Sequence, residues 1–207
     1  MTQPRKNFAL QSIIPKGFSL IEVLVTIIIL MVGLLGLAGL QGRALSAQME
    51  SYQRAQALIL LKDMSNRIEI NRKNAASYVT TGLTPAYLGT DVPSATCAGI
   101  GQTRDFCEWN NALLGAAETQ QTGGSKVGAM IGARGCVYQI VAPATGAASQ
   151  YLIVVAWQGI NSTYAPDATT ATSAGQCGFH QYLDKAGAFQ EKLHRVISLP
   201  IAVADLK

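Results

Sequence analysis

The longest apolar stretch of the chain lies near its N-terminus. From Phe18 to Leu40 the only charged residue is Glu22. As an α-helix these 23 residues would be about 35 Å long, because each residue adds ~1.5 Å. A helix of about 30 Å can cross the hydrocarbon core of a membrane. The pattern therefore predicts a transmembrane helix over residues 18–40. An acid inside such a helix costs at least ~2.5 kcal/mol at the bilayer centre, so we expect the carboxylate to have a use.

The next segment, residues 41–77, contains no proline and changes from wholly apolar to amphipathic. An apolar stripe recurs at spacings of three and four, which places its residues on one face of a helix: Ala57, Leu60, Leu61, Met64 and Ile68. We therefore expect the helix to continue through this segment, with its apolar face packed on a globular domain. Packing of the same face against a partner helix is an alternative.

The remainder, residues 78–207, reads as a globular domain with loops, one short helix and several strands. The helix is expected at 105–114, with Trp109 as a core residue. Runs rich in β-branched and aromatic residues predict strands at 136–142, 151–157 and 196–203. Because Pro200 lacks a backbone N–H, the last of these is expected to be an edge strand or to contain a bulge.

The charge distribution bears on partners and on topology. The formal net charge is +4, but Arg5, Lys6 and Lys16 precede the apolar run. Without residues 1–17 the chain has 13 basic and 12 acidic residues, a net charge of +1, so no nucleic-acid partner is predicted. Positive residues before the span favour a cytoplasmic N-terminus and place the globular domain outside the cytoplasmic membrane.

All four cysteines follow the apolar run, at Cys97, Cys107, Cys136 and Cys177. Outside a reducing cytoplasm they are expected to form disulfides. Four cysteines allow three pairings, of which we favour Cys97–Cys107, closing a small loop, and Cys136–Cys177, clamping the strands. A metal site is not predicted, because the chain has no Cys-x-x-Cys motif and its histidines have no ligand-like spacing to the cysteines.

The sequence gives no sign of catalysis or of a cofactor. It contains no nucleophile elbow, phosphate-binding loop or metalloprotease motif. The only histidines are His180 and His194. His194 alternates with apolar residues at the start of a strand, so we interpret it as a surface or structural residue. The chain is therefore not expected to be an enzyme, and no catalytic or cofactor-binding residue is assigned.

Residues 17–22, Gly-Phe-Ser-Leu-Ile-Glu, resemble the class III signal of type IV prepilins. The resemblance implies that residues 1–17 are a leader and that a prepilin peptidase cuts after Gly17 and N-methylates Phe18. It also implies that Glu22 pairs with the amine of Phe18 on a neighbouring subunit. A plain transmembrane anchor and a secretory signal peptide are the alternatives, but neither explains Glu22.

Three later segments resemble minor pilins of the pilus-modification (PilV) type. They are residues 58–70, residues 107–110 (Cys-Glu-Trp-Asn) and residues 155–159 (Val-Ala-Trp-Gln-Gly). This resemblance implies an α+β fold in which a long N-terminal helix packs on an antiparallel β-sheet. It also implies a protein that resides in the inner membrane lipid, with a periplasmic domain, before it enters the type IV pilus.

The same resemblance implies a function in assembly. A minor pilin primes the pilus or is incorporated into it, and its N-terminal helix contacts other minor and major pilins. Two alternatives remain open. One is a pseudopilin of type II secretion, and the other is an adhesin or binding module carried on the pilus, with the polar loop at 161–175 as its surface.

Overall fold

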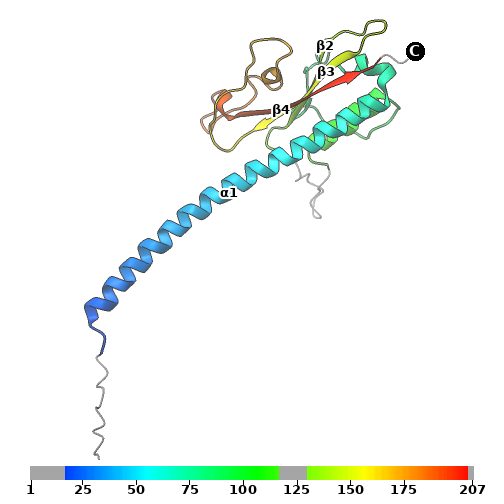
Figure 1. The fold of residues 1–207 in the computed structure, drawn as a ribbon. Coiled ribbons are helices and arrows are strands. Elements are labelled where there is room, and N and C mark those ends of the chain that lie inside the picture. Colours follow the sequence, from blue (N-terminus) through cyan, green and yellow to red (C-terminus); the bar gives the residue numbers. More distant parts are fainter. Residues whose placement is uncertain (1–16, 117–129, 205–207) are drawn as a thin grey trace, which may run out of the picture. The chain divides into compact units, whose positions relative to one another are not determined.

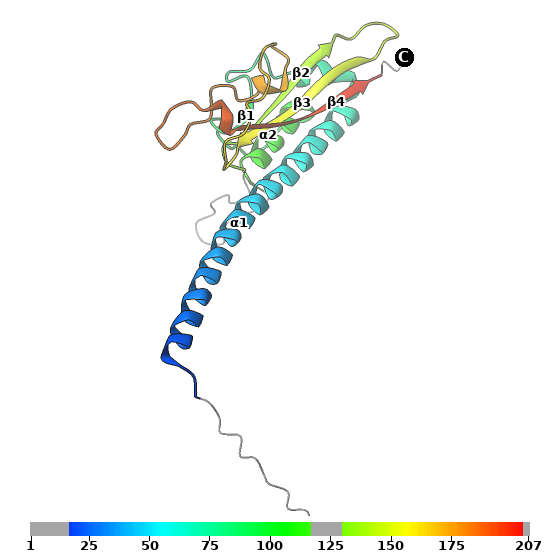
Figure 2. The ribbon, with the colours of Figure 1, turned by 60° about the vertical axis from the view of Figure 1, so that its left-hand side comes forward.

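The computed structural model describes residues 17–116 and 130–204 (Figures 1 and 2). Of the expected leader, only Gly17 is among these residues. The elements follow one another as α1 (Leu20–Ile70), η1 (Arg72–Tyr78), β1 (Leu88–Gly89), α2 (Gln102–Leu113), β2 (Arg134–Val141), β3 (Ser149–Gln158), η2 (Ala174–Gln176), η3 (Glu191–Leu193) and β4 (His194–Val203). The chain divides into two compact units, one ending at Leu45 and the other beginning at Ser46.

Helix α1 runs for 51 residues without a break. It ends at Ile70, seven residues before the expected limit of 77, and the chain continues as the tighter 3-10 helix η1. The change of helix type coincides with hydrogen bonds from side chains. Asn71 Nδ2 donates to the Tyr78 hydroxyl, and Asn74 Nδ2 donates to Asn71 Oδ1. These bonds connect side chains of η1 and of the residue before it, and so hold the segment that follows Ile70.

The four strands form one antiparallel sheet in the order β1-β2-β3-β4. The predicted strands at 136–142, 151–157 and 196–203 correspond to β2, β3 and β4 and are confirmed. As expected from Pro200, β4 is an edge strand, which pairs only with β3 among the described residues. Strand β1 was not predicted, because two residues are too few to show an alternating pattern.

Central strand β3 is buried on both faces, which explains why its sequence is almost continuously apolar. On one face Tyr151, Ile153, Val155 and Trp157 pack in the main core with the C-terminal half of α1 and with α2. On the other face Val154 and Ala156 pack in a second cluster, which includes both cysteines of one disulfide. Figures 1 and 2 show the C-terminal half of α1 and helix α2 on the same side of the sheet. This arrangement confirms the predicted α+β fold.

The amphipathic stripe of α1 faces the main core. Ala57, Leu61, Met64 and Ile68 are all at least 98% buried. Across from them, the fully buried Trp109 of α2 donates its indole N–H to the carbonyl oxygen of Leu60 at 3.0 Å. The predicted role of Trp109 as a core residue is therefore confirmed.

The contact between α2 and β2 depends on a glycine. A Cβ atom placed on Gly135 of β2 would lie 2.3 Å from the Trp109 ring and 2.7 Å from Leu113. Both distances are far shorter than a van der Waals contact. Only glycine therefore allows α2 to approach the strand this closely.

Two disulfides fasten loops to these elements. Cys97–Cys107 joins the loop after β1 to α2, with Cα atoms 5.4 Å apart. Cys136–Cys177 joins β2 to the segment just after η2, with Cα atoms 5.8 Å apart. Cys136 and Cys177 are both buried in the second apolar cluster, whereas the Cys97–Cys107 bond lies nearer the surface.

A cluster of charged side chains connects α1 to α2. Arg67 of α1 forms ion pairs with Asp63, Asp105 and Glu108, with nitrogen–oxygen distances of 3.0, 3.0 and 2.7 Å. The Tyr78 hydroxyl donates to the other oxygen of Asp105. Burial lowers the pKa of Arg67, but the bonds to Glu108 and the two aspartates outweigh it, so the pKa is raised overall. Burial and the bond to Asp105 raise the pKa of Tyr78 to about 12.

We expect Arg67→Met to destabilise the domain by about 2 kcal/mol at neutral pH, because it leaves Asp63 and Asp105 without their cation and Glu108 with Arg104 alone. The partial exposure of the cluster keeps the effect below that of a fully buried pair. The bonds from Arg104 and Arg67 lower the pKa of Glu108, so the stability that depends on its charge is lost as the pH falls through this lowered pKa. The difference in stability between the variant and wild type is therefore expected to narrow at acid pH. Urea unfolding followed by circular dichroism measures both effects. Arg104→Met, which removes an exposed partner of Glu108, is the control and is expected to change little.

Candidate functional site: the N-terminal segment and its apolar helix

The backbone is not helical at Gly17, Phe18 and Ser19, and α1 begins at Leu20. The Ser19 carbonyl oxygen accepts the first helical hydrogen bonds, from the backbone N–H groups of Glu22 and Val23. Gly17 is exposed, and a Cβ atom placed on it would meet nothing within 4 Å. The peptide bond between Gly17 and Phe18 therefore lies in accessible, non-helical backbone directly before the helix.

Glu22 is the only acid in the first turn of α1. The free N–H groups at a helix N-terminus carry partial positive charge, which favours a carboxylate in this turn. The side chain is exposed and lies four residues after Phe18. A spacing of four residues corresponds to about one helical turn, so a group carried by Phe18 and the carboxylate lie near the same end of the helix.

The first unit of the chain consists almost entirely of exposed apolar side chains. Every described residue from Gly17 to Leu45 is exposed, including Phe18 at 84% and Leu35 at 73%. Soluble monomers rarely expose a continuous apolar surface of this extent. Helix α1 is also long and apolar enough to cross a membrane. Such a surface suits contact with lipid or with other apolar helices.

The glycines at positions 33, 36, 39 and 42 lie within this part of α1 and do not interrupt it. A Cβ atom placed on any of the four would meet nothing within 4 Å. Each glycine lowers the stability of an exposed helix by about 1 kcal/mol relative to alanine. The segment is thus a continuous helix of low intrinsic stability.

The two histidines have structural surroundings. His194 is almost fully buried, with Nδ1 at 3.0 Å from a Glu191 carboxylate oxygen and Nε2 at 2.9 Å from the Cys177 carbonyl oxygen. Burial lowers the pKa of His194, although both of these contacts oppose the shift. His180 is exposed, and its ring stacks with those of Phe179 and Phe189. In the part of the chain that the structure describes, no group of three or more His, Cys, Asp or Glu side chains is arranged to hold a metal ion.

Sequence reasoning missed several residues that fix the domain. The spacing of Asp63 and Arg67 predicts an ion pair on one helix, but no pattern links them to Asp105 and Glu108. The buried Asn110 was likewise not singled out, although its side chain accepts the backbone N–H of Gly89 at 2.7 Å and so attaches β1 to α2. A polar residue beside Trp109 on an amphipathic helix was the only available signal.

Family comparisons agree with this geometry. Residues 15–38 match the model of the prokaryotic N-terminal methylation motif, and residues 39–109 match the model of the type IV pilin Tt1218. The chain is a type IV pilin with an N-terminal methylation motif. Type IV pilins are structural proteins, so the expectation that the chain is not an enzyme agrees with the match. No curated protein and no solved structure matches the chain.

Together the two matches cover residues 15–109, which include all of α1 and most of α2. The methylation motif implies processing at a class III signal by a prepilin peptidase. The pilin match extends from the exposed part of α1 through the apolar stripe and into α2, where it ends at Trp109. It names the type IV pilins in general and does not distinguish the pilus-modification type.

Proposed function

We propose that this pilin is a minor pilin, which is cleaved after Gly17, N-methylated on Phe18, and then primes a type IV pilus or is incorporated into it. Cleavage at this position is supported by the accessible, non-helical backbone of residues 17–19. A peptidase needs an extended segment to reach the bond, and Gly17 has no side chain that would hinder its approach.

The observation that carries the proposal is the apolar surface of α1, which is exposed up to Leu45 and has one carboxylate in its first turn. Side-by-side packing of such helices in a filament removes the apolar surface from water. In that dry core an unpaired Glu22 would be costly. The new amine of Phe18 on a neighbouring subunit supplies the opposite charge, so Glu22 serves assembly rather than anchoring alone.

Before assembly the protein is proposed to span the inner membrane, with a cytoplasmic N-terminus and a periplasmic domain. The basic residues of the leader support this orientation. The two disulfides also support it, because disulfides persist in the oxidising periplasm and are rare in the cytoplasm. The partners of the N-terminal helix are then lipid in the membrane and other minor and major pilins in the filament.

A pseudopilin of type II secretion is the second candidate. Pseudopilins often carry a calcium site built from loop acids, but the loop at 161–175 contains a single acid, Asp167. Its carboxylate accepts the backbone N–H of Thr169 at 2.9 Å, which makes it part of a local turn. This observation disfavours a calcium-binding pseudopilin and leaves the minor pilin as the better proposal. An adhesin role for the same loop is the third candidate.

Deletion of the protein tests the assembly role. We expect far fewer surface filaments by electron microscopy, and recovery when the wild-type chain is supplied from a plasmid. Normal filament number together with loss of protein secretion would instead establish the pseudopilin. Shortening the loop at 161–175 tests the adhesin separately, since it would then abolish adhesion while the filament number stays normal.

A further inference from the structure

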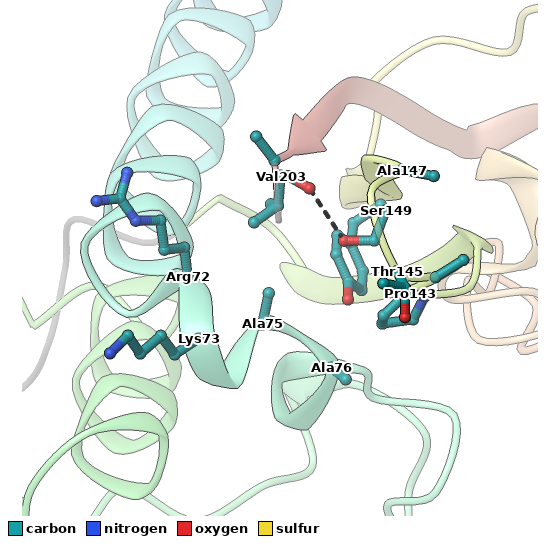
Figure 3. Close-up of a pocket in the computed structure, with 12 residues that line it drawn as sticks. Arg72, Lys73, Ala75, Ala76, Pro143, Thr145, Ala147, Ser149 and Val203 are labelled. Carbon is teal, nitrogen blue, oxygen red and sulfur yellow. Dashed lines mark hydrogen bonds between the residues drawn. The ribbon is translucent and has the colours of Figure 1, made fainter. Parts of the chain in front are cut away.

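A pocket of about 390 Å³ lies in the second unit, where the start of η1, the loop between β2 and β3, and the end of β4 meet (Figure 3). Its apolar walls come from Ala75, Ala76, Pro143, Ala147 and Val203. Pockets that bind small ligands have volumes of roughly 300–1,000 Å³ and mostly apolar walls. The size and the walls therefore suit a small group that is itself partly apolar.

Both charged side chains that line the pocket in the described part of the chain are basic. They are Arg72 and Lys73, and no acidic residue among those described lines it. Neither cation has a hydrogen-bond or ion-pair partner among the described residues. Figure 3 shows the charged ends of both side chains directed away from the wall formed by Pro143 and Thr145. Because both residues are exposed, these long side chains are free to turn towards a bound anion.

A buried hydroxyl group provides the second, independent observation. Tyr151 of β3 lines the pocket and is fully buried, yet its hydroxyl has no hydrogen-bond partner within the described parts of the chain. A buried polar group without a hydrogen-bond partner destabilises the folded state. By contrast, the Ser149 hydroxyl at the same pocket donates to the Val203 carbonyl oxygen at 3.3 Å. Tyr151 is therefore the group at this pocket that lacks its partner.

We propose that this pocket binds a carboxylate attached to a small apolar group, such as the C-terminal residue of a peptide. The carboxylate accepts the hydrogen bond of the Tyr151 hydroxyl and attracts Arg72 and Lys73, while the alanine, proline and valine side chains contact the apolar group. Hydrogen bonds to an ionised acceptor are about twice as strong as neutral ones. This ligand therefore satisfies the unpaired hydroxyl, the excess of positive charge and the apolar walls together. The site is independent of the N-terminal helix and of its role in assembly.

Methyl NMR of the full chain in detergent micelles, with labelled alanine methyl groups, tests the proposal. The probe is N-acetyl-alanyl-alanine, and the matched control is the same compound with an amide in place of its carboxylate. We expect saturable shifts of the Ala75, Ala76 and Ala147 signals with a Kd on the order of 1 mM, and roughly tenfold weaker binding of the amide. Ala57, in the core between α1 and the sheet, is expected not to shift.

Variants identify the side chains that are responsible for binding the carboxylate. Tyr151→Phe removes only the unpaired hydroxyl, so we expect it to fold normally and to weaken binding roughly five- to tenfold. The double variant Arg72→Gln/Lys73→Gln is expected to weaken binding of the carboxylate but not of the amide. Arg54→Gln, which removes an exposed cation of α1 outside this pocket, is the control and is expected to bind as wild type.

Four results would overturn the proposal. They are the absence of saturable shifts at these alanines, equal binding of the carboxylate and the amide, unchanged binding by a folded Tyr151→Phe variant, and tighter binding of inorganic phosphate than of the peptide. The first would mean that only water occupies the pocket. The last would assign the site to a phosphate instead of a carboxylate.

Discussion

Glu22→Ala is expected to abolish incorporation of the protein into filaments while leaving its processing intact. In the proposed filament the variant would bury the Phe18 amine of a neighbour without its partner. Leaving one charge of a buried pair uncompensated costs about 3–5 kcal/mol, which corresponds to at least a hundredfold loss of incorporation. Immunoblots of sheared filaments, normalised to the most abundant pilin, measure this loss. The size of the membrane-bound form shows whether the leader has been removed.

Two further variants separate charge from shape at this position. Glu22→Gln keeps nearly the same size without the charge and is expected to fail as Glu22→Ala does. Glu22→Asp keeps the charge on a shorter side chain and is expected to retain part of the incorporation. Incorporation of Glu22→Gln at the wild-type level would mean that the carboxylate does not pair with an amine in the filament.

Removal of the Cys136–Cys177 disulfide has the largest expected effect on the stability of the domain. The bond joins residues separated by 41 positions, whereas Cys97 and Cys107 are separated by 10. In the chain-entropy model, loops of these lengths correspond to about 4 and about 3 kcal/mol of stabilisation. Both cysteines of the longer loop are also buried beside Val154 and Tyr182, so their replacement disturbs a packed cluster as well.

Two double variants, Cys136→Ala/Cys177→Ala and Cys97→Ala/Cys107→Ala, allow this comparison. Thermal unfolding of the full chain in detergent, followed by near-ultraviolet circular dichroism, measures the loss of stability in each variant. We expect the first variant to unfold at a lower temperature than the second, and both to unfold below wild type. A greater loss of thermal stability in the second variant would show that the Cys97–Cys107 bond contributes more to the stability of the domain than the Cys136–Cys177 bond.

Periodicity and composition were sufficient to predict the main elements of this pilin. The spacing of Ala57, Leu61, Met64 and Ile68 identified the buried face of α1, because a helix returns to the same side every three or four residues. Strand β3 was equally clear, since a strand buried on both faces contains few polar residues. Pro200 correctly marked β4 as an edge strand.

The features that the sequence did not predict depend on contacts between distant segments. Just after the end of α1 at Ile70, Asn71 donates a hydrogen bond to the Tyr78 hydroxyl. In β1, the backbone N–H of Gly89 donates to the Asn110 side chain of α2. The pocket beside Tyr151 forms where three separate segments meet, so no local pattern reveals it. The N-terminal site is different, because its residues are consecutive and a short motif is enough to recognise it.

The central claim is that the chain is processed at Gly17 and enters a type IV pilus. Mass spectrometry of filaments sheared from cells tests it most directly. The account predicts a peptide that begins at Phe18, carries one additional methyl group on its amine, and occurs beside a far more abundant pilin. A chain that retains residues 1–17 in actively piliated cells, or a processed chain confined to the membrane fraction, would contradict it.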